Sequence, residues 1–152
     1  MIKRQAPNAL VFGPVTAGYG EMVSLQDAPD QAGREYLDFY LDTAKTLEMT
    51  EGKRILDVLD VHWYPDVQVD GKSLVDASHQ DIFTPQKANP STAEIEARVQ
   101  APRSLWDPTY VEDSWITKYD NGHQPIRLIP WLKEKIAVHY PGTKLAITEY
   151  NL

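Results

Sequence analysis

The chain has 152 residues, 42% of them hydrophobic, which is enough for one domain with a buried core. Its 15 Lys and Arg against 22 Asp and Glu give a net charge of −7, which argues against nucleic acid or an anionic membrane as the main partner, since both need a basic face. The absence of Cys and of a long apolar run excludes disulfides, thiolate chemistry and a membrane span.

Three short apolar runs bounded by turn residues predict buried strands over residues 8–15, 55–64 and 144–150. Apolar residues at helical spacing predict helices over 30–52 and 125–142. The order strand, helix, strand, long insertion, helix, strand predicts an α/β fold with a parallel sheet. Because the strand runs are nearly continuous, we expect each strand to be buried on both faces.

The two helices carry end signals as well as apolar faces. Asp30 would cap the first helix and Gly52 would end it, while Pro125 suits the first turn of the second and Pro130 marks a start or a kink. The expected apolar faces are Tyr36, Leu37, Tyr40, Leu41, Ala44 and Leu47 in the first helix, and Leu128, Ile129, Leu132 and Ile136 in the second.

The stretch 65–122 shows little periodicity. Only 91–100 resembles a helix, with Ser91 and Glu94 at the spacing of a capping box. The stretch also holds two of the four Trp, in 104-SLWDPTYVEDSWI-116, and such residues are uncommon in disordered segments. We therefore expect a long ordered insertion that covers the active-site face of a single domain over 1–152.

All three strand ends carry chemically distinctive residues. The first strand leads to Gly18-Tyr19-Gly20-Glu21, the second to His62-Trp63-Tyr64-Pro65 and the third to Glu149-Tyr150-Asn151. In a parallel α/β fold the carboxyl ends of the strands share one edge, where functional groups collect. Carboxylate, imidazole, phenol and indole groups together are the composition expected of a carbohydrate-cleaving cleft.

Each of these groups has a role that its chemistry suggests. Glu149 would attack an anomeric carbon or stabilise an oxocarbenium-like transition state, and Tyr64 would orient that carboxylate by a hydrogen bond. His62 would bind a sugar hydroxyl or a carboxylate. The indoles of Trp63, Trp106 and Trp115 offer flat apolar faces to pyranose rings.

Other interpretations compete with these roles. Glu149 could be a helix-capping or surface residue, and His62 could be a core histidine. A metal site at Asp57, Asp60 and His62 is disfavoured, because alternation along a strand puts Asp57 on the opposite face from the other two. The glycines near the first strand end lack the partners of a phosphate loop. His79 and His123 fall in predicted loops and are interpreted as surface residues.

Four segments together resemble glycoside hydrolase family 44. They are 8-NALVFGPV-15, 56-LDVLDVHWYPD-66, 104-SLWDPTYVEDSWI-116 and 140-YPGTKLAITEYN-151. The resemblance spans nearly the whole chain in the right order, and the third segment combined with ITEYN is specific. It implies an endo-β-1,4-glucanase, also active on xyloglucan, that is built as a (β/α)8 barrel and works by a retaining mechanism.

The resemblance also implies site residues. Glu149 matches the nucleophile on barrel strand seven, so the three strands here would be strands five, six and seven. Tyr64 would stand near that nucleophile with His62 as an auxiliary residue. The expected substrate-binding aromatics are Tyr19, Trp63, Trp106, Tyr110, Trp115 and Tyr150.

One expected part of the catalytic machinery has no counterpart in the sequence. The acid/base glutamate of the family lies in an Asn-Glu-Pro type motif on barrel strand four, and this chain contains no Asn-Glu pair. Residues 1–7 read like the end of the fourth barrel helix, so we interpret the chain as an internal fragment that is inactive on its own. Glu21 and Glu112 are not placed at a strand-four end and do not substitute.

Two alternatives stay open beside the enzyme fragment: a non-catalytic module that binds β-glucan, and an α/β interaction domain without affinity for sugar. We expect a β-glucan as the partner and no organic cofactor or catalytic metal, with a structural calcium ion, oligomeric state and substrate preference left open. The resemblance implies that the full-length enzyme is secreted, although no signal-peptide pattern follows Met1.

Overall fold

A computed structural model describes residues 2–25, 31–74 and 90–150 of the chain. The chain divides into two compact units: unit 1 is Met1–Trp63 with Trp131–Tyr150, and unit 2 is Tyr64–Pro130 with Asn151–Leu152. The described residues contain no helix that is long and apolar enough to cross a membrane. The expected cap Asp30, the histidine His79 and the strand-end residue Asn151 lie outside the described residues.

Unit 1 is built on a three-stranded parallel sheet. Its strands are β1 (Phe12–Thr16), β2 (Val58–Trp63) and β5 (Lys144–Tyr150), in the order β1-β2-β5. The three predicted strands and their parallel arrangement are therefore confirmed. β1 begins four residues later than expected, and Val11 just before it is held by the backbone and side chain of Asp57.

The expectation that all three strands are buried on both faces is correct only for β2. Leu59 and Val61 in this central strand are fully buried. In the flanking strands, by contrast, Phe12 is 47% and Tyr150 is 68% exposed. The expectation fails for β1 and β5 because each has a neighbouring strand on one side only among the described residues.

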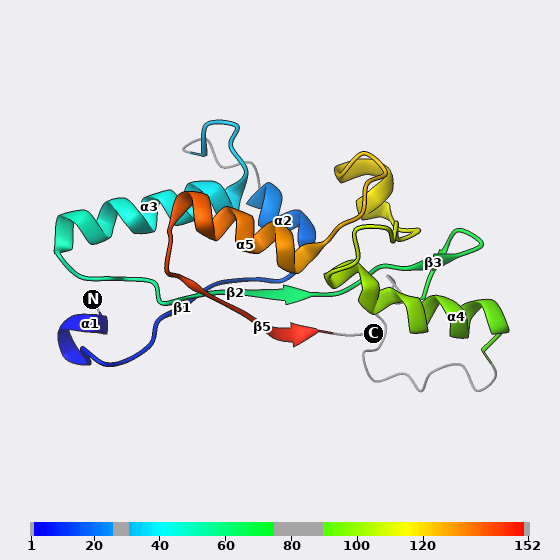
Figure 1. The fold of residues 1–152 in the computed structure, drawn as a ribbon, viewed down its shortest axis with the longest axis horizontal. Helices are drawn as coiled ribbons and strands as arrows, with labels where there is room; N and C mark the ends of the chain where they lie inside the picture. Colours follow the sequence, from blue (N-terminus) through cyan, green and yellow to red (C-terminus); the bar gives the residue numbers. More distant parts are fainter. Residues whose placement is uncertain (1, 26–30, 75–89, 151–152) are drawn as a thin grey trace. The chain divides into compact units, whose positions relative to one another are not determined.

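Helices α2 (Tyr19–Val23), α3 (Tyr36–Glu51) and α5 (Leu128–His139) cover one face of the sheet, and the short α1 (Ile2–Gln5) precedes it (Figure 1). Leu37 and Leu41 of α3 and Leu132 of α5 are fully buried between helices and sheet. Leu47 was expected on the same apolar face but is 45% exposed, because it lies near the end of α3.

Gly52 ends α3 as the sequence predicts. Its φ of 66° lies in the left-handed region, and its N–H donates to the carbonyl of Glu48. A residue with a Cβ is strained in this conformation, whereas Asn tolerates it better than other side chains do.

We expect Gly52→Ala to lower the free energy of unfolding by about 1 kcal/mol. The cause is the steric cost of a Cβ at a left-handed helix end. Urea denaturation followed by circular dichroism measures it, with Gly52→Asn as the control that loses less. Equal losses for the two variants would contradict this explanation of the helix end.

The second long helix begins later than the sequence suggested. The expectation that Pro125 opens it is wrong, because Arg127 has a φ of 49°, which no right-handed helix accommodates. α5 therefore starts at Leu128. Pro130 falls in its first turn, where a missing N–H leaves no helical hydrogen bond unmade.

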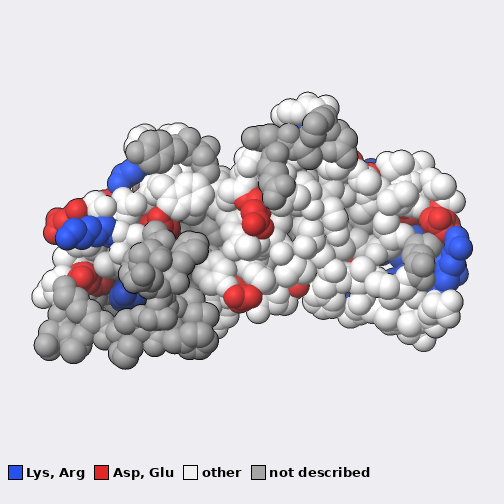
Figure 2. Space-filling model, turned by 180° about the vertical axis from the view of Figure 1, so that it is seen from behind, with Lys and Arg blue, Asp and Glu red and all other residues white. Residues whose placement is uncertain are grey.

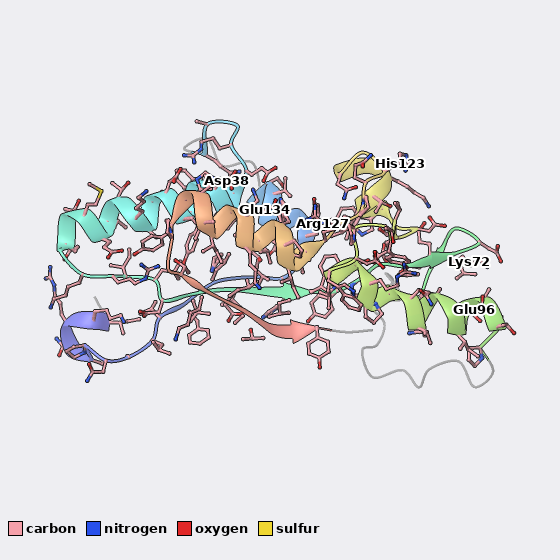
Figure 3. The ribbon with its side chains drawn as sticks, viewed as in Figure 1. Asp38, Lys72, Glu96, His123, Arg127 and Glu134 are labelled. Atoms are coloured by element: carbon pink, nitrogen blue, oxygen red, sulfur yellow. The ribbon has the colours of Figure 1, made fainter. Side chains whose placement is uncertain are left out.

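A charged cluster joins α3 to α5 within unit 1. The ammonium group of Lys135 contacts the carboxylates of Glu35 and Asp38, the latter at 2.7 Å, and His139 lies between Asp38 and Asp42 at 3.3 and 3.0 Å. Figure 3 labels Asp38 beside α5. Partial burial raises the pKa of Asp42, but hydrogen bonds from Arg34 and His139 outweigh it and lower that pKa overall. The cluster links α3 to α5, two of the helices that cover the sheet.

Unit 2 contains more regular structure than its weak periodicity suggested. It holds the hairpin β3 (Gln68–Val69) and β4 (Lys72–Ser73), helix α4 (Thr92–Gln100), the 3-10 helix η3 (Ala101–Leu105) and the π-helix η4 (Ile116–Asp120). The predicted capping box is confirmed, since Ser91 and Glu94 bond each other's backbone N–H groups. The hairpin turn at Asp70-Gly71, with both φ values positive, went unpredicted although Asp-Gly is its usual signal.

Candidate active site

The carboxyl ends of β1, β2 and β5 lie along one edge of the sheet, because the three strands are parallel. In the register of β2 with β5, His62 pairs with Glu149 and Trp63 with Tyr150. The register shifts between Val61 and His62, and such an irregularity changes the direction of the side chain that follows it. Four residues predicted to be functional therefore lie on adjacent strand ends.

Glu149 and His62 form the chemical centre of this edge. Their nearest atoms, the Glu149 Oε2 and the His62 Nδ1, are 3.3 Å apart. The side chain of Glu149 is 58% exposed and that of His62 is 17% exposed. Solvent reaches this carboxylate and an imidazole lies against one side of it, so it can act on a bound ligand. The expected proximity of Glu149 and His62 is present.

The three residues of the disfavoured metal site each have a different partner. Asp60 is buried and accepts a hydrogen bond of 2.8 Å from Thr148 Oγ1, on the strand that carries Glu149. Asp57 pairs with Lys3 at 2.7 Å near the opposite ends of the strands. The described residues contain no group of three or more His, Cys, Asp or Glu side chains able to hold a metal ion.

The aromatic residues expected to bind substrate in unit 1 differ in exposure. Tyr150 is exposed, whereas Tyr19 is 9% and Trp63 is 1% exposed. The ring of Tyr19 packs on that of Trp131, with 5.5 Å between centroids. The indole N–H of Trp63 is buried without a hydrogen-bond partner among the described residues. These two rings therefore pack in the core of unit 1, and their expected contact with substrate stays a prediction.

The remaining predicted site residues belong to unit 2. Trp106 is 53% exposed and Trp115 is 36% exposed, while Tyr64 and Tyr110 are half-buried. The hydrogen bond expected from Tyr64 to Glu149 would join the two units and stays a prediction. His123, interpreted as a surface residue, is exposed.

The sequence did not predict the structural role of Glu112 in unit 2. This carboxyl is 1% exposed, and Ser104 Oγ donates to it at 2.5 Å. Thr117 Oγ1 donates to the backbone carbonyl of the same residue, also at 2.5 Å. Burial raises the pKa of Glu112 above its ordinary value of 4.5, and the Ser104 hydrogen bond only partly opposes this. Three consecutive polar residues in 111-VEDSW-115 gave no signal of such burial.

The raised pKa of Glu112 predicts a stability that depends on pH. The Glu112 carboxyl holds its proton more tightly in the folded state than in the unfolded chain. Its contribution to the free energy of unfolding is therefore complete below pH 4.5 and is lost as pH rises through the folded pKa. We expect Glu112→Gln, which keeps an acceptor for Ser104, to remove that part of the slope. Urea denaturation from about pH 4 to about pH 7 measures it. A variant with the slope of the unaltered chain would contradict the assignment.

The parallel sheet carries a carboxylate beside an imidazole at its carboxyl edge, which is the edge where parallel α/β enzymes place their catalytic groups. The sequence model of Glycoside hydrolase family 44 matches residues 1–67. Endoglucanase A of Paenibacillus lautus is 48% identical over 97% of the chain. The resemblance to glycoside hydrolase family 44 that the sequence indicated is therefore confirmed.

Solved structures of this family agree with the fold. The endoglucanase Cel44A from Clostridium thermocellum matches 99% of the chain at 43% identity with a TM-score of 0.81. A xyloglucanase from Paenibacillus polymyxa matches 99% at 41% identity with a TM-score of 0.82, and a further structure of a xyloglucanase from that organism contains xyloglucan. The chain spans 20% of the P. lautus protein and 28% of each of these structures.

Proposed function

We propose that the chain forms the nucleophile-bearing part of a retaining endo-β-1,4-glucanase that hydrolyses cellulose- or xyloglucan-type polysaccharides. The observation that carries the proposal is Glu149 at the tip of β5. It is exposed, lies 3.3 Å from His62, and belongs to a chain 48% identical to an endoglucanase. The three strands would be strands five, six and seven of a (β/α)8 barrel, with residues 65–122 as the insertion over its active-site face.

In the proposed reaction, Glu149 attacks the anomeric carbon of a β-glucosidic bond. A covalent glycosyl-enzyme forms, and a second carboxyl group protonates the departing sugar oxygen. Water then releases the sugar with its configuration retained, while the second carboxylate takes the proton from that water. The two carboxyls must lie about 5 Å apart, and we assign the second one to a residue outside this chain, since the sequence has no Asn-Glu pair.

The other side chains would bind and orient. His62 holds Glu149 from one side, and we propose that Tyr64 donates to it from another, which orients the carboxylate. Tyr150 and the half-exposed Trp106 and Trp115 would stack on sugar rings. The two-carboxylate reaction needs no cofactor, so we propose none. We further propose that the full-length enzyme is secreted, because its polymeric substrates lie outside the cell.

A chimera tests this function. The matching segment of the P. lautus endoglucanase A is replaced by residues 1–152, and hydrolysis of xyloglucan, cellulose and mannan is measured together with the anomeric configuration of the first product by NMR. We expect hydrolysis of a β-glucan with retention, and no hydrolysis by the isolated chain. A folded chimera without activity, or with an inverted product, would overturn the proposal.

The exposure of Trp106 and Trp115 in unit 2 favours a second candidate function, a β-glucan-binding module without catalysis. This candidate predicts that the isolated chain binds cello- or xyloglucan oligosaccharides and that the chimera stays inactive. The two functions are thus separated by hydrolysis rather than by binding.

A further inference from the structure

A carboxylate with three hydrogen bonds and an ion pair organises the turn in 106-WDPTY-110. Asp107 Oδ1 accepts from the backbone N–H and the hydroxyl of Thr109 at 2.8 and 2.7 Å. Asp107 Oδ2 accepts from the Nε of Arg103 at 2.8 Å and forms an ion pair with the Nη2 of the same guanidinium at 2.7 Å. The hydrogen bonds from Thr109 and Arg103 hold the pKa of Asp107 at about 2, so this carboxylate is charged at neutral pH.

Arg103 makes further contacts that hold its side chain and its backbone in place. Its Nη1 donates to the Gln100 side chain at 2.8 Å, and its guanidinium carbon lies 5.0 Å from the centroid of the Tyr110 ring. Its backbone carbonyl accepts from the N–H groups of Trp106 and Asp107 at 3.1 and 2.8 Å. The planar fork of arginine suits such simultaneous pairing and stacking, which lysine cannot reproduce.

The network holds the chain on both sides of an exposed indole. Trp106 lies directly before Asp107, and 53% of it is exposed. Tyr110 follows Thr109 and stacks against Arg103. An aromatic side chain on a backbone that is already ordered loses less conformational entropy when a ligand binds, so its affinity for a sugar ring rises.

We propose that Arg103 and Asp107 are positioning residues that hold Trp106 and Tyr110 as a pre-ordered stacking surface for a pyranose ring of the β-glucan. The inference rests on the proposed function for the identity of its ligand. It assigns the salt bridge a role in affinity for substrate. The ion pair is partly open to solvent, with side-chain exposures of 38% for Arg103 and 19% for Asp107, and such a pair contributes little to stability by itself. A role in affinity therefore accounts better for its elaborate partners.

The test measures binding of cellohexaose and of a xyloglucan oligosaccharide to the full chain by calorimetry and Trp fluorescence. Trp106→Ala should weaken the measured binding more than any other variant of the series. Asp107→Asn and Arg103→Lys should weaken it about three- to tenfold, the effect of freeing one or two ordered side chains. The matched control Asp113→Asn removes the same charge from another ion pair of unit 2, with Lys118, and should change affinity less than about twofold.

Two milder substitutions at Thr109 test the same network with less risk of misfolding. Thr109→Val removes one hydrogen bond to Asp107 at nearly constant volume and should weaken binding, while Thr109→Ser keeps the hydroxyl and should restore it. Loss of binding in Trp106→Ala with full affinity in Asp107→Asn, Arg103→Lys and Thr109→Val would overturn the inference. So would the absence of saturable binding by the unaltered chain. Neither result depends on hydrolysis by the chimera, so this inference and the proposed function are tested separately.

Discussion

Glu149→Gln in the chimera is expected to lower kcat/KM on xyloglucan roughly a thousandfold or more, on the scale of other nucleophile removals. The amide has nearly the shape of the carboxylate but cannot attack the anomeric carbon. Oligosaccharide affinity should change little, because the aromatic stacking surfaces stay in place. Initial rates of reducing-sugar release and calorimetric binding measure the two quantities.

The matched control is Glu134→Gln, the same change on the exposed surface of α5, where Figure 3 labels the residue. It should leave the rate within about twofold of the unaltered chimera, as expected of a surface substitution. If both variants lose activity equally, Glu149 has no special catalytic part.

Azide rescue sharpens the assignment further. Glu149→Ala in the chimera leaves space for a small anion where the nucleophile stood, so added sodium azide should restore glycosidic cleavage and yield a glycosyl azide of inverted configuration. If Glu149 instead acted as the acid/base, the azide product would retain its configuration. NMR of the product distinguishes the two roles.

The largest effect on stability is expected for Leu37→Ala. This side chain is fully buried between α3 and the sheet, and its truncation leaves a cavity. The free energy of unfolding should fall by about 3 kcal/mol. Leu47→Ala on the same helix removes the same atoms from a position that is 45% exposed and should cost less than about 1 kcal/mol. Urea denaturation of both variants measures the difference, and equal losses would contradict the described core.

Local signals in the sequence were sufficient for several elements. β5 spans the predicted residues 144–150, because an apolar run there is bounded by Gly142 on one side. Gly52 and the Ser91–Glu94 capping box marked helix ends correctly, since both depend on a few adjacent backbone groups. The parallel sheet followed from the order of strands and helices.

Other features depended on contacts between distant residues. Tyr19 and Trp63 carry the residue types of a sugar site, yet packing buries both, and Leu47 fits an apolar periodicity but lies where α3 leaves the core. The burial of Glu112 arises from Ser104 and Thr117, whose hydroxyls reach it only in the folded unit. Periodicity cannot show which apolar or polar group finds such partners.

The sequence by itself determined the resemblance to the family, the parallel α/β arrangement and the motif that holds Glu149, because these depend on residue order and on local patterns. Only the tertiary structure decided that His62 lies beside this carboxylate and that Arg103 and Asp107 fix the turn after Trp106. The first pairing requires the register of two strands more than eighty residues apart. The second requires a particular turn geometry, and neither is encoded in residue type alone.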